Sequence, residues 1–248
     1  MELHQYSVNQ GETRLLVKSD VEGVDGPVSD AVSEARIQLL SHIDLVPEFR
    51  WSMEPIEPPG MDLPDFIRSM YAAGQVSGVG PFASVAGALA GVAAQTAVEA
   101  GSSNVIVENG GDLCLYGEGP FTVGIFAGTS PFSQALGFRV IPGHSFTGLC
   151  TSSGTVGDSV SFGEADAVVA YVPDSPAVAD ALATSICNEV IGNSGVELGI
   201  EKARGIGVGG VAIIFGEKFG AWGKLPDLVD VARGENDFTL DARVHSRA

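Results

Sequence analysis

Apolar residues recur at helical spacing in several segments of the chain. The clearest series runs through residues 27–45, where the apolar positions are Val28, Ala31, Val32, Ala35, Leu39, Leu40 and Ile43. This spacing places them on one face of a helix, with Pro27 in the first turn, where a missing N–H costs least. Comparable patterns predict helices over residues 63–73, 82–100, 177–190 and 195–204. The helix at 177 follows Ser175 and Pro176, a cap residue and a first-turn proline.

Short apolar runs separated by turns rich in glycine and proline predict strands. A strand or hairpin is expected over residues 5–21 with Gly11 near its turn, and further strands over 104–108, 113–116, 121–126, 136–141, 146–151, 165–172 and 211–215. The turns between 104 and 151 are too short for parallel crossovers, so we expect an antiparallel meander there. Strands in a run with helices around them predict an α+β fold of mainly antiparallel sheets flanked by helices. The acidic segment after Leu225 is expected only to close the chain.

Composition excludes some partners. The chain has 248 residues, of which 45% are hydrophobic, enough for a substantial core. Its 13 Lys and Arg residues stand against 31 Asp and Glu residues, which gives a net charge of −18. A field of this sign repels nucleic acid and anionic membrane surfaces, so we expect neither as a partner. An anionic ligand would need local donor groups to overcome it.

The sequence also indicates a cytoplasmic location. The first residues have neither a basic start nor an apolar core, so no secretory signal is expected there. The apolar run 82–98 is dominated by alanine and glycine and predicts a tightly packed core helix better than a membrane span. The three cysteines cannot all pair and form no CxxC motif, so reduced thiols are the simplest interpretation.

Three loops of small residues, followed by one helix, carry the candidate chemistry. The loops are Gly80-Pro81-Phe82-Ala83-Ser84-Val85-Ala86-Gly87, Asn109-Gly110-Gly111-Asp112 and Cys150-Thr151-Ser152-Ser153-Gly154-Thr155, and the helix carries Asp180 and Thr184 four residues apart on one face. Glycine and serine let backbone N–H groups approach an anion closely. We therefore expect these segments to converge on one pocket for a small phosphorylated or nucleotide-like ligand. Ser84, Asn109, Gly110, Gly111, Asp112, Thr151, Ser152 and Ser153 are its candidate binding residues.

Each of these motifs also has a purely structural interpretation. The Asn109–Asp112 segment is compatible with a hairpin turn that needs positive φ. Strand-end serines and threonines often satisfy their own backbone, and Asp180 would favour the dipole of its helix if it lay in the first turn. Cys150 is a candidate nucleophile or sulfur carrier beside hydroxyl groups. No His or Lys is adjacent to it to lower its pKa, so a buried inert thiol is the other interpretation.

The ordered motifs resemble the ApbE flavin-transferase superfamily, and more closely an ApbE-like family of anaerobic bacteria and archaea that forms a distant branch of it. The matching residues are Val107-Glu108-Asn109-Gly110-Gly111-Asp112, Val123-Gly124-Ile125, Thr151-Ser152-Ser153-Gly154 and Ala179-Asp180-Ala181-Leu182-Ala183-Thr184. The resemblance is clear over residues 80–190 and implies a single ApbE-like domain over 1–248, with two lobes as the alternative. It also implies a site for FAD or FMN at Asn109–Asp112 and magnesium ligands at Asp180 and Thr184.

The chain departs from the transferase pattern in two places. The Gly-x-x-x-Lys-Gly segment of the transferases reads Ser84-Val85-Ala86-Gly87 here, without the lysine. The His-x-x-Asp-Pro-x-Thr-Gly segment that should follow Gly154 has no histidine, and Asp158 is the spare carboxylate at that place. Standard FMN transfer is therefore not expected, and any reaction would use Asp158 or Cys150. Two alternatives stay open: a sulfur-assimilation or sulfur-carrier protein on the same scaffold, and a structural homo-oligomer whose loops only turn corners.

Overall fold

A computed structural model describes residues 3–156, 161–231 and 238–240 of the chain. Its helices are α1 (Asp25–Leu45), α2 (Glu48–Trp51), α3 (Asp65–Ser77), the 3-10 turn η1 (Pro81–Ser84), α4 (Val85–Glu99), α5 (Pro176–Cys187) and α6 (Gly195–Ile206). Its strands are β1 (His4–Gln10), β2 (Thr13–Ser19), β3 (Val105–Asn109), β4 (Asp112–Gly117), β5 (Phe121–Ile125), β6 (Leu136–Val140), β7 (Gly143–Ser152), β8 (Ala167–Val172), β9 (Gly210–Phe215), β10 (Lys218–Gly223), β11 (Asp227–Asp230) and β12 (Phe238–Leu240).

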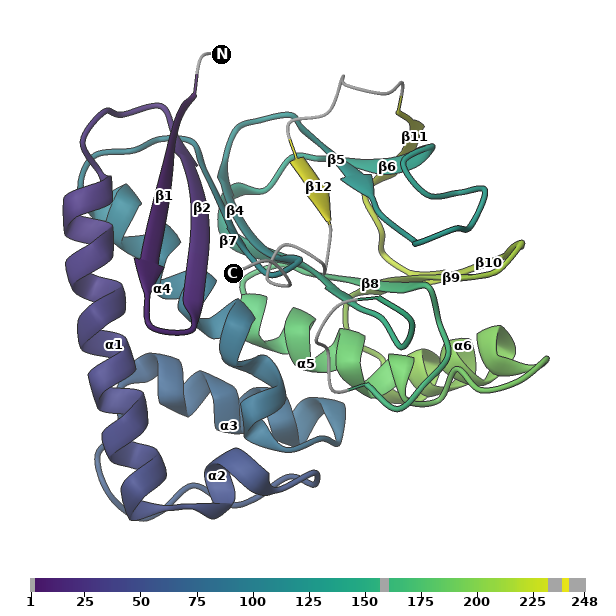
Figure 1. Cartoon of the computed structure of the whole chain (residues 1–248), viewed down its shortest axis with the longest axis horizontal. Coiled ribbons are helices and arrows are strands. Elements are labelled where there is room, and N and C mark those ends of the chain that lie inside the picture. The colour runs from purple at the N-terminus through teal and green to yellow at the C-terminus, as the bar shows by residue number, and fades with distance from the viewer. Residues whose placement is uncertain (1–2, 157–160, 232–237, 241–248) are drawn as a thin grey trace.

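The strands form two sheets. The larger has eight strands in the order β1-β2-β3-β4-β7-β8-β9-β10, with every neighbouring pair antiparallel. The smaller has four strands in the order β11-β6-β5-β12, in which only the β12–β5 pair is parallel. Figure 1 shows the helices on one side of the large sheet and the strands of the small sheet on the other. The α+β fold of mainly antiparallel sheets, predicted from the sequence, is confirmed.

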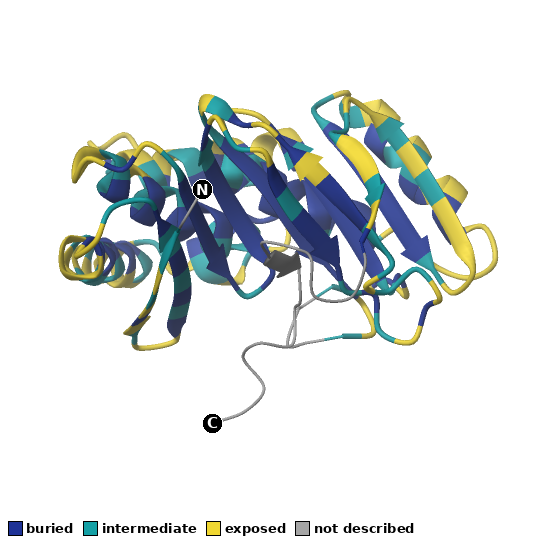
Figure 2. Cartoon of the chain, turned by 90° about the horizontal axis from the view of Figure 1, so that it is seen from above, coloured by how far each residue is buried: buried dark blue, intermediate teal, exposed yellow. Residues whose placement is uncertain are grey.

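The central strands of the large sheet are buried on both faces, and their side chains alternate between two cores. Ile106, Leu113, Leu115, Leu149 and Val169 pack in one cluster with the small-sheet residues Phe121, Val123, Phe138 and Val140. Their neighbours along the strands point to the helices instead, as Val168, Ala170, Val211 and Ile213 do toward α5 and α6. This is the period of two that a pleated strand imposes. The central strands are accordingly buried along nearly their whole length (Figure 2).

Helix α4 is the most apolar helix and packs inside the fold. Its alanines at positions 90, 93, 94 and 97 are fully buried, and it contacts α1, α5, β3 and β4. Among the described residues, the stretch Pro81–Glu99 is the one helical segment whose length and composition would suffice to cross a membrane, and half of it is buried within the protein. The buried core helix of a globular protein can have the same length and composition, so this stretch is only weak evidence for a membrane-spanning helix.

The predicted meander is wrong in one respect. The strands are antiparallel, but β5 and β6 leave the run and build the second sheet, so that β4 pairs directly with β7. The reason is burial: Phe121 and Phe138, on β5 and β6, are 1% exposed only because this hairpin folds over the large sheet.

The predicted 82–100 helix begins as the 3-10 turn η1 and becomes α-helical at Val85. Helix α2 and strands β10, β11 and β12 were not predicted.

Candidate functional site

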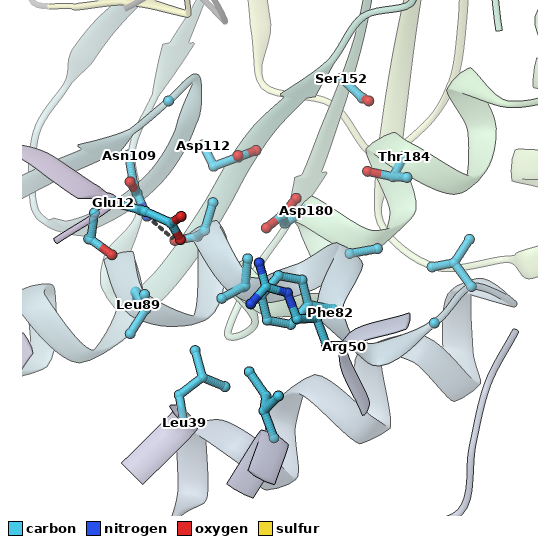
Figure 3. Close-up of a pocket in the computed structure, with 18 of the residues that line it drawn as sticks. Glu12, Leu39, Arg50, Phe82, Leu89, Asn109, Asp112, Ser152, Asp180 and Thr184 are labelled. Carbon is cyan, nitrogen blue, oxygen red and sulfur yellow. Dashed lines mark hydrogen bonds between the residues drawn. The ribbon is translucent and has the colours of Figure 1, made fainter. Parts of the chain in front are cut away.

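A cavity of about 570 Å³ lies between the helices and the ends of strands in the large sheet. It is lined by the β1–β2 turn, by α1, by α2 with the residues that follow it, by the start of α4, by the β3–β4 turn, by the end of β7 and by α5. Seven of the residues singled out from the sequence line it: Asn109, Gly110, Asp112, Thr151, Ser152, Asp180 and Thr184. Figure 3 shows Asn109, Asp112, Ser152, Asp180 and Thr184 together on one side of it. The expected convergence of distant segments is therefore present.

The β3–β4 turn is both a hairpin turn and a wall of the cavity. Asn109 pairs with Asp112 across it, and Gly110 and Gly111 take φ values of 67° and 99°, which only glycine adopts freely. Glu108, 2% exposed, accepts the N–H of Gly111 at 2.8 Å through Oε1. Asn109 Nδ2 donates to the carbonyl of Ala86 at 3.0 Å, which ties the turn to the start of α4 (Figure 3).

Asp180 is held by the N-terminus of another helix. Ser175 caps α5 by accepting the N–H of Val178, and Asp180 follows in the second turn. Its Oδ2 accepts the N–H of Gly87 at 2.8 Å, in the first turn of α4. A carboxylate there satisfies a free helix N–H and favours the helix dipole. Asp180 thus stabilises the N-terminus of α4. From the sequence, it was expected to favour the dipole of its own helix, α5.

Two buried carboxylates face the same space. Asp112 and Asp180 are each 7% exposed. Burial raises the pKa of Asp180 to about 7, against the lowering effect of hydrogen bonds from the backbone of Gly87 and Ala86. Burial, followed by the nearby charge of Asp180, raises the pKa of Asp112 well above its usual range, although its Oδ1 accepts the N–H of Thr151 at 3.2 Å. The pair retains a proton near neutrality unless a cation is present to neutralise it.

The donor set on this side of the cavity consists of oxygens. Besides the two carboxylates it contains the Thr184 hydroxyl, and Ser152, whose Oγ lies 2.5 Å from Ser161 Oγ. Thr151 Oγ1 is buried and has no hydrogen-bond partner in the described part of the chain. Hard oxygen ligands of this kind suit magnesium, which keeps several waters and shares phosphate oxygens. Across residues 3–156, 161–231 and 238–240, no group of three or more His, Cys, Asp or Glu side chains forms a ready-made metal centre, so these oxygens fit magnesium only with a ligand's help.

The other side of the cavity is lined mainly by apolar side chains and by the positively charged side chain of Arg50. Leu39 and Leu89 line it, and Arg50 lies over the ring of Phe82 (Figure 3). Phe82 belongs to the first of the three loops of small residues, whereas Leu89 and Arg50 were not singled out from the sequence. Leu39 belongs to the predicted apolar face of α1, and only its place beside the oxygen cluster distinguishes it from an ordinary core residue.

Three candidate binding residues support the walls without lining the cavity. The Ser84 hydroxyl is buried and donates to the carbonyl of Pro81 at 2.7 Å. Ser153 Oγ donates to Ala165 O and accepts the N–H groups of Thr155 and Val156, which is the structural use of a strand-end serine. Gly111 gives its N–H to Glu108.

Of the two candidate catalytic residues, the one that the structure describes, Cys150, does not line the cavity. Cys150 is fully buried, with Sγ 3.9 Å from Leu113 O and 3.6 Å from Pro176 O. Burial, together with the charges of Asp112 and Asp180, raises the pKa of its thiol well above the usual range, which is the opposite of what a thiolate nucleophile needs. The environment favours the inert-thiol interpretation. Asp158 lies outside the described residues.

Gly87 lies in close contact with α5, and we expect G87A to destabilise the fold. A Cβ there would overlap the carbonyl oxygen of Pro176 and lie 2.8 Å from Cβ of Asp180. Overpacking of this kind costs about 2 kcal/mol, which urea unfolding would show. G205A is the matched control, because its Cβ meets nothing within 4 Å and alanine favours a helix. Equal free energies of unfolding for G87A and the wild type would contradict the close contact.

Comparison with known proteins supports the resemblance. A family model described as "AbpE bacteria" matches residues 1–204. A UPF0280 protein of Methanosarcina acetivorans is 39% identical over 219 residues, covering 88% of this chain and 85% of that protein. The UPF0280 protein MJ1526 of Methanocaldococcus jannaschii is 39% identical over 224 residues, covering 88% and 90%.

Comparison with solved structures shows which known fold the chain shares. The apo form of the flavinyl transferase ApbE from Pseudomonas stutzeri superposes with a TM-score of 0.55 at 14% identity, covering 89% of this chain and 94% of that one. The flavin transferase ApbE from Vibrio cholerae gives a TM-score of 0.51 at 15% identity, covering 89% and 96%. The chain therefore belongs to the ApbE-like family described as AbpE bacteria, and it shares the overall fold of the ApbE flavin transferases.

Proposed function

We propose that this protein binds a flavin nucleotide, or a closely related nucleotide-like molecule, in the 570 Å³ cavity together with magnesium. The observation that carries the proposal is the convergence of Asn109, Asp112, Ser152, Asp180 and Thr184 from separate segments around one space. The resemblance to ApbE associates the same motifs with a flavin nucleotide and magnesium. The volume lies within the range of small-molecule sites.

Magnesium would bind at the oxygen-rich side. Asp180 and Thr184 supply a carboxylate and a hydroxyl one helical turn apart, and Asp112 supplies a second carboxylate from β4. When bound, the ion would neutralise phosphate charge against the two carboxylates. Without it, the same carboxylates repel a phosphate, so binding of the nucleotide and of the ion should be coupled.

The chain's own residues would orient the organic part of the ligand. The apolar wall that includes Leu39 and Leu89 can receive the flat face of a ring, and burial against it excludes water. The Asn109 side chain is fixed by its bond to Ala86 O, so its carbonyl oxygen is left to accept a hydrogen bond from the ligand. These contacts would position the ligand with its charged part toward Asp180.

Binding, not the standard transfer reaction, is what we propose. The sequence has no lysine within residues 84–87 and no histidine within residues 155–163, the two places where the transferase pattern has them. No observation favours sulfur carriage, because the Cys150 thiol is buried with a raised pKa and does not line the cavity.

Calorimetric titration with FMN, FAD and ADP, each with and without magnesium, tests the proposal. We expect at least one flavin nucleotide to bind, and magnesium to tighten the binding about tenfold by relieving the repulsion from Asp112 and Asp180. Calcium is the control ion, because it is larger and tolerates other geometries. Failure of FMN and FAD to bind in the presence of magnesium would overturn the proposal.

A further inference from the structure

We propose that Arg50 is an anion-binding residue of the cavity, and that its guanidinium group receives a phosphate or carboxylate of the ligand. The proposal deepens the proposed function and rests on the same cavity. It adds a specific cationic contact from α2, a segment that carries none of the motifs by which the site was found.

The guanidinium is held in place by aromatic rings. Its central carbon lies 4.9 Å from the ring centroid of Trp51 and 5.7 Å from that of Phe82. Phe82 in turn packs edge-on against Phe49, at 6.4 Å between centroids, and Phe49 is fully buried. Stacking on rings fixes the plane of an arginine while leaving the N–H groups at its edge available. Arg50 is thus preorganised for a ligand at its edge.

The donors of Arg50 have no partner in the described part of the chain. Its side chain makes no hydrogen bond and no ion pair with residues 3–156, 161–231 or 238–240, although it lines the cavity. Arg36, the other lining arginine, donates instead to Thr13 Oγ1 at 2.6 Å and so holds the β1–β2 turn. A positioned guanidinium with five unused donors, facing a cavity, is suited to bidentate binding of a phosphate or carboxylate.

Electrostatics favours the same assignment. Asp112 and Asp180 repel an anion in the absence of magnesium, and the chain as a whole carries a net charge of −18. Arg50 is the cationic lining residue whose donors are not already used by the described residues. An anionic group that enters without a metal ion is therefore expected to bind at Arg50.

The first test detects the anion directly. In ¹⁵N-labelled protein without magnesium, the side-chain Nε–H signal of Arg50 is identified by its loss in R50K. We expect inorganic phosphate to shift this signal saturably at constant ionic strength, where an equal addition of chloride does not. An unshifted signal at millimolar phosphate would overturn the proposal.

The second test distinguishes a ligand's phosphate from free phosphate. FMN and riboflavin differ only in the phosphate, so the ratio of their affinities reports its binding. In the absence of magnesium, we expect R50Q to lower this ratio about tenfold, through the FMN affinity, while riboflavin binding stays the same. R204Q removes the same charge from α6 at an exposed residue that does not line the cavity, and it should leave the ratio unchanged. R50K should lie between R50Q and the wild type, because lysine keeps the charge but loses the planar fork.

The outcomes separate the two proposals. Magnesium-dependent FMN binding with an unchanged ratio in R50Q would overturn the role of Arg50 and leave the proposed function standing. A phosphate-dependent shift of Arg50 in a protein that binds neither FMN nor FAD would support the anion site and overturn the proposed function.

Discussion

Replacing Asp180 with alanine is expected to abolish the effect of magnesium on flavin-nucleotide binding. Asp180 is the carboxylate that faces the cavity from α5, one helical turn from Thr184, and its loss leaves too few charged oxygens to hold the ion. We expect the affinity for FMN in the presence of magnesium to fall about tenfold or more, to the value without the ion. Titration of the variant with FMN, with and without magnesium, measures the change.

A second variant separates the metal site from the fold. Asp180→Asn keeps an oxygen that accepts the Gly87 N–H and removes only the charge, so it should fold normally and still lose the magnesium effect. Thr184→Val, which keeps the shape of the side chain, should weaken the effect less, because a hydroxyl is a weaker ligand than a carboxylate. Persistence of the full magnesium effect in D180N would show that the ion, if bound, is held elsewhere.

The carboxylate pair should also make stability depend on pH. Burial raises the pKa of Asp180 to about 7 in the folded protein, against 3.8 for the free side chain. Between these values the folded state binds more protons than the unfolded state, so this group's contribution to stability falls as the pH rises from about 4 to about 7. Each extra bound proton corresponds to about 1.4 kcal/mol per pH unit.

The measurement compares the wild type with D180N in urea at pH 5, 6 and 7 without magnesium. We expect the free energy of unfolding of the wild type to fall relative to that of D180N by about 1 kcal/mol per pH unit. The comparison is needed because burial lowers the pKa of His42, which makes stability rise with pH below 6.5 and opposes the effect of Asp180. A relative rise instead of a fall would contradict a raised pKa at Asp180. Saturating magnesium should reduce the slope, since the ion replaces the proton.

Local sequence was sufficient for most elements and for several of the residues that line the cavity. The apolar spacing in residues 27–45 predicted α1, and Ser175 with Pro176 predicted the start of α5, because helical periodicity and capping depend on neighbours in sequence. The ordered loops predicted Asn109, Asp112 and Ser152, the helix after them predicted Asp180, and all four residues line one cavity. Their order along the chain carried the information, since each motif alone also fits a simple turn or cap.

Only the tertiary structure showed which other residues line the cavity and which contacts the motif residues make. Arg50 lies in a four-residue helix with no motif around it, and only its contact with Phe82, thirty-two positions away, places it in the cavity. Asp180 caps α4 across 93 residues of sequence, and the β5–β6 hairpin leaves the large sheet to bury Phe121 and Phe138. These features depend on packing between segments that are distant in sequence. Local sequence patterns depend only on residues close together in the chain, so they cannot predict such features. Periodicity along the sequence determined the helices and strands, and packing between distant segments determined which residues line the cavity.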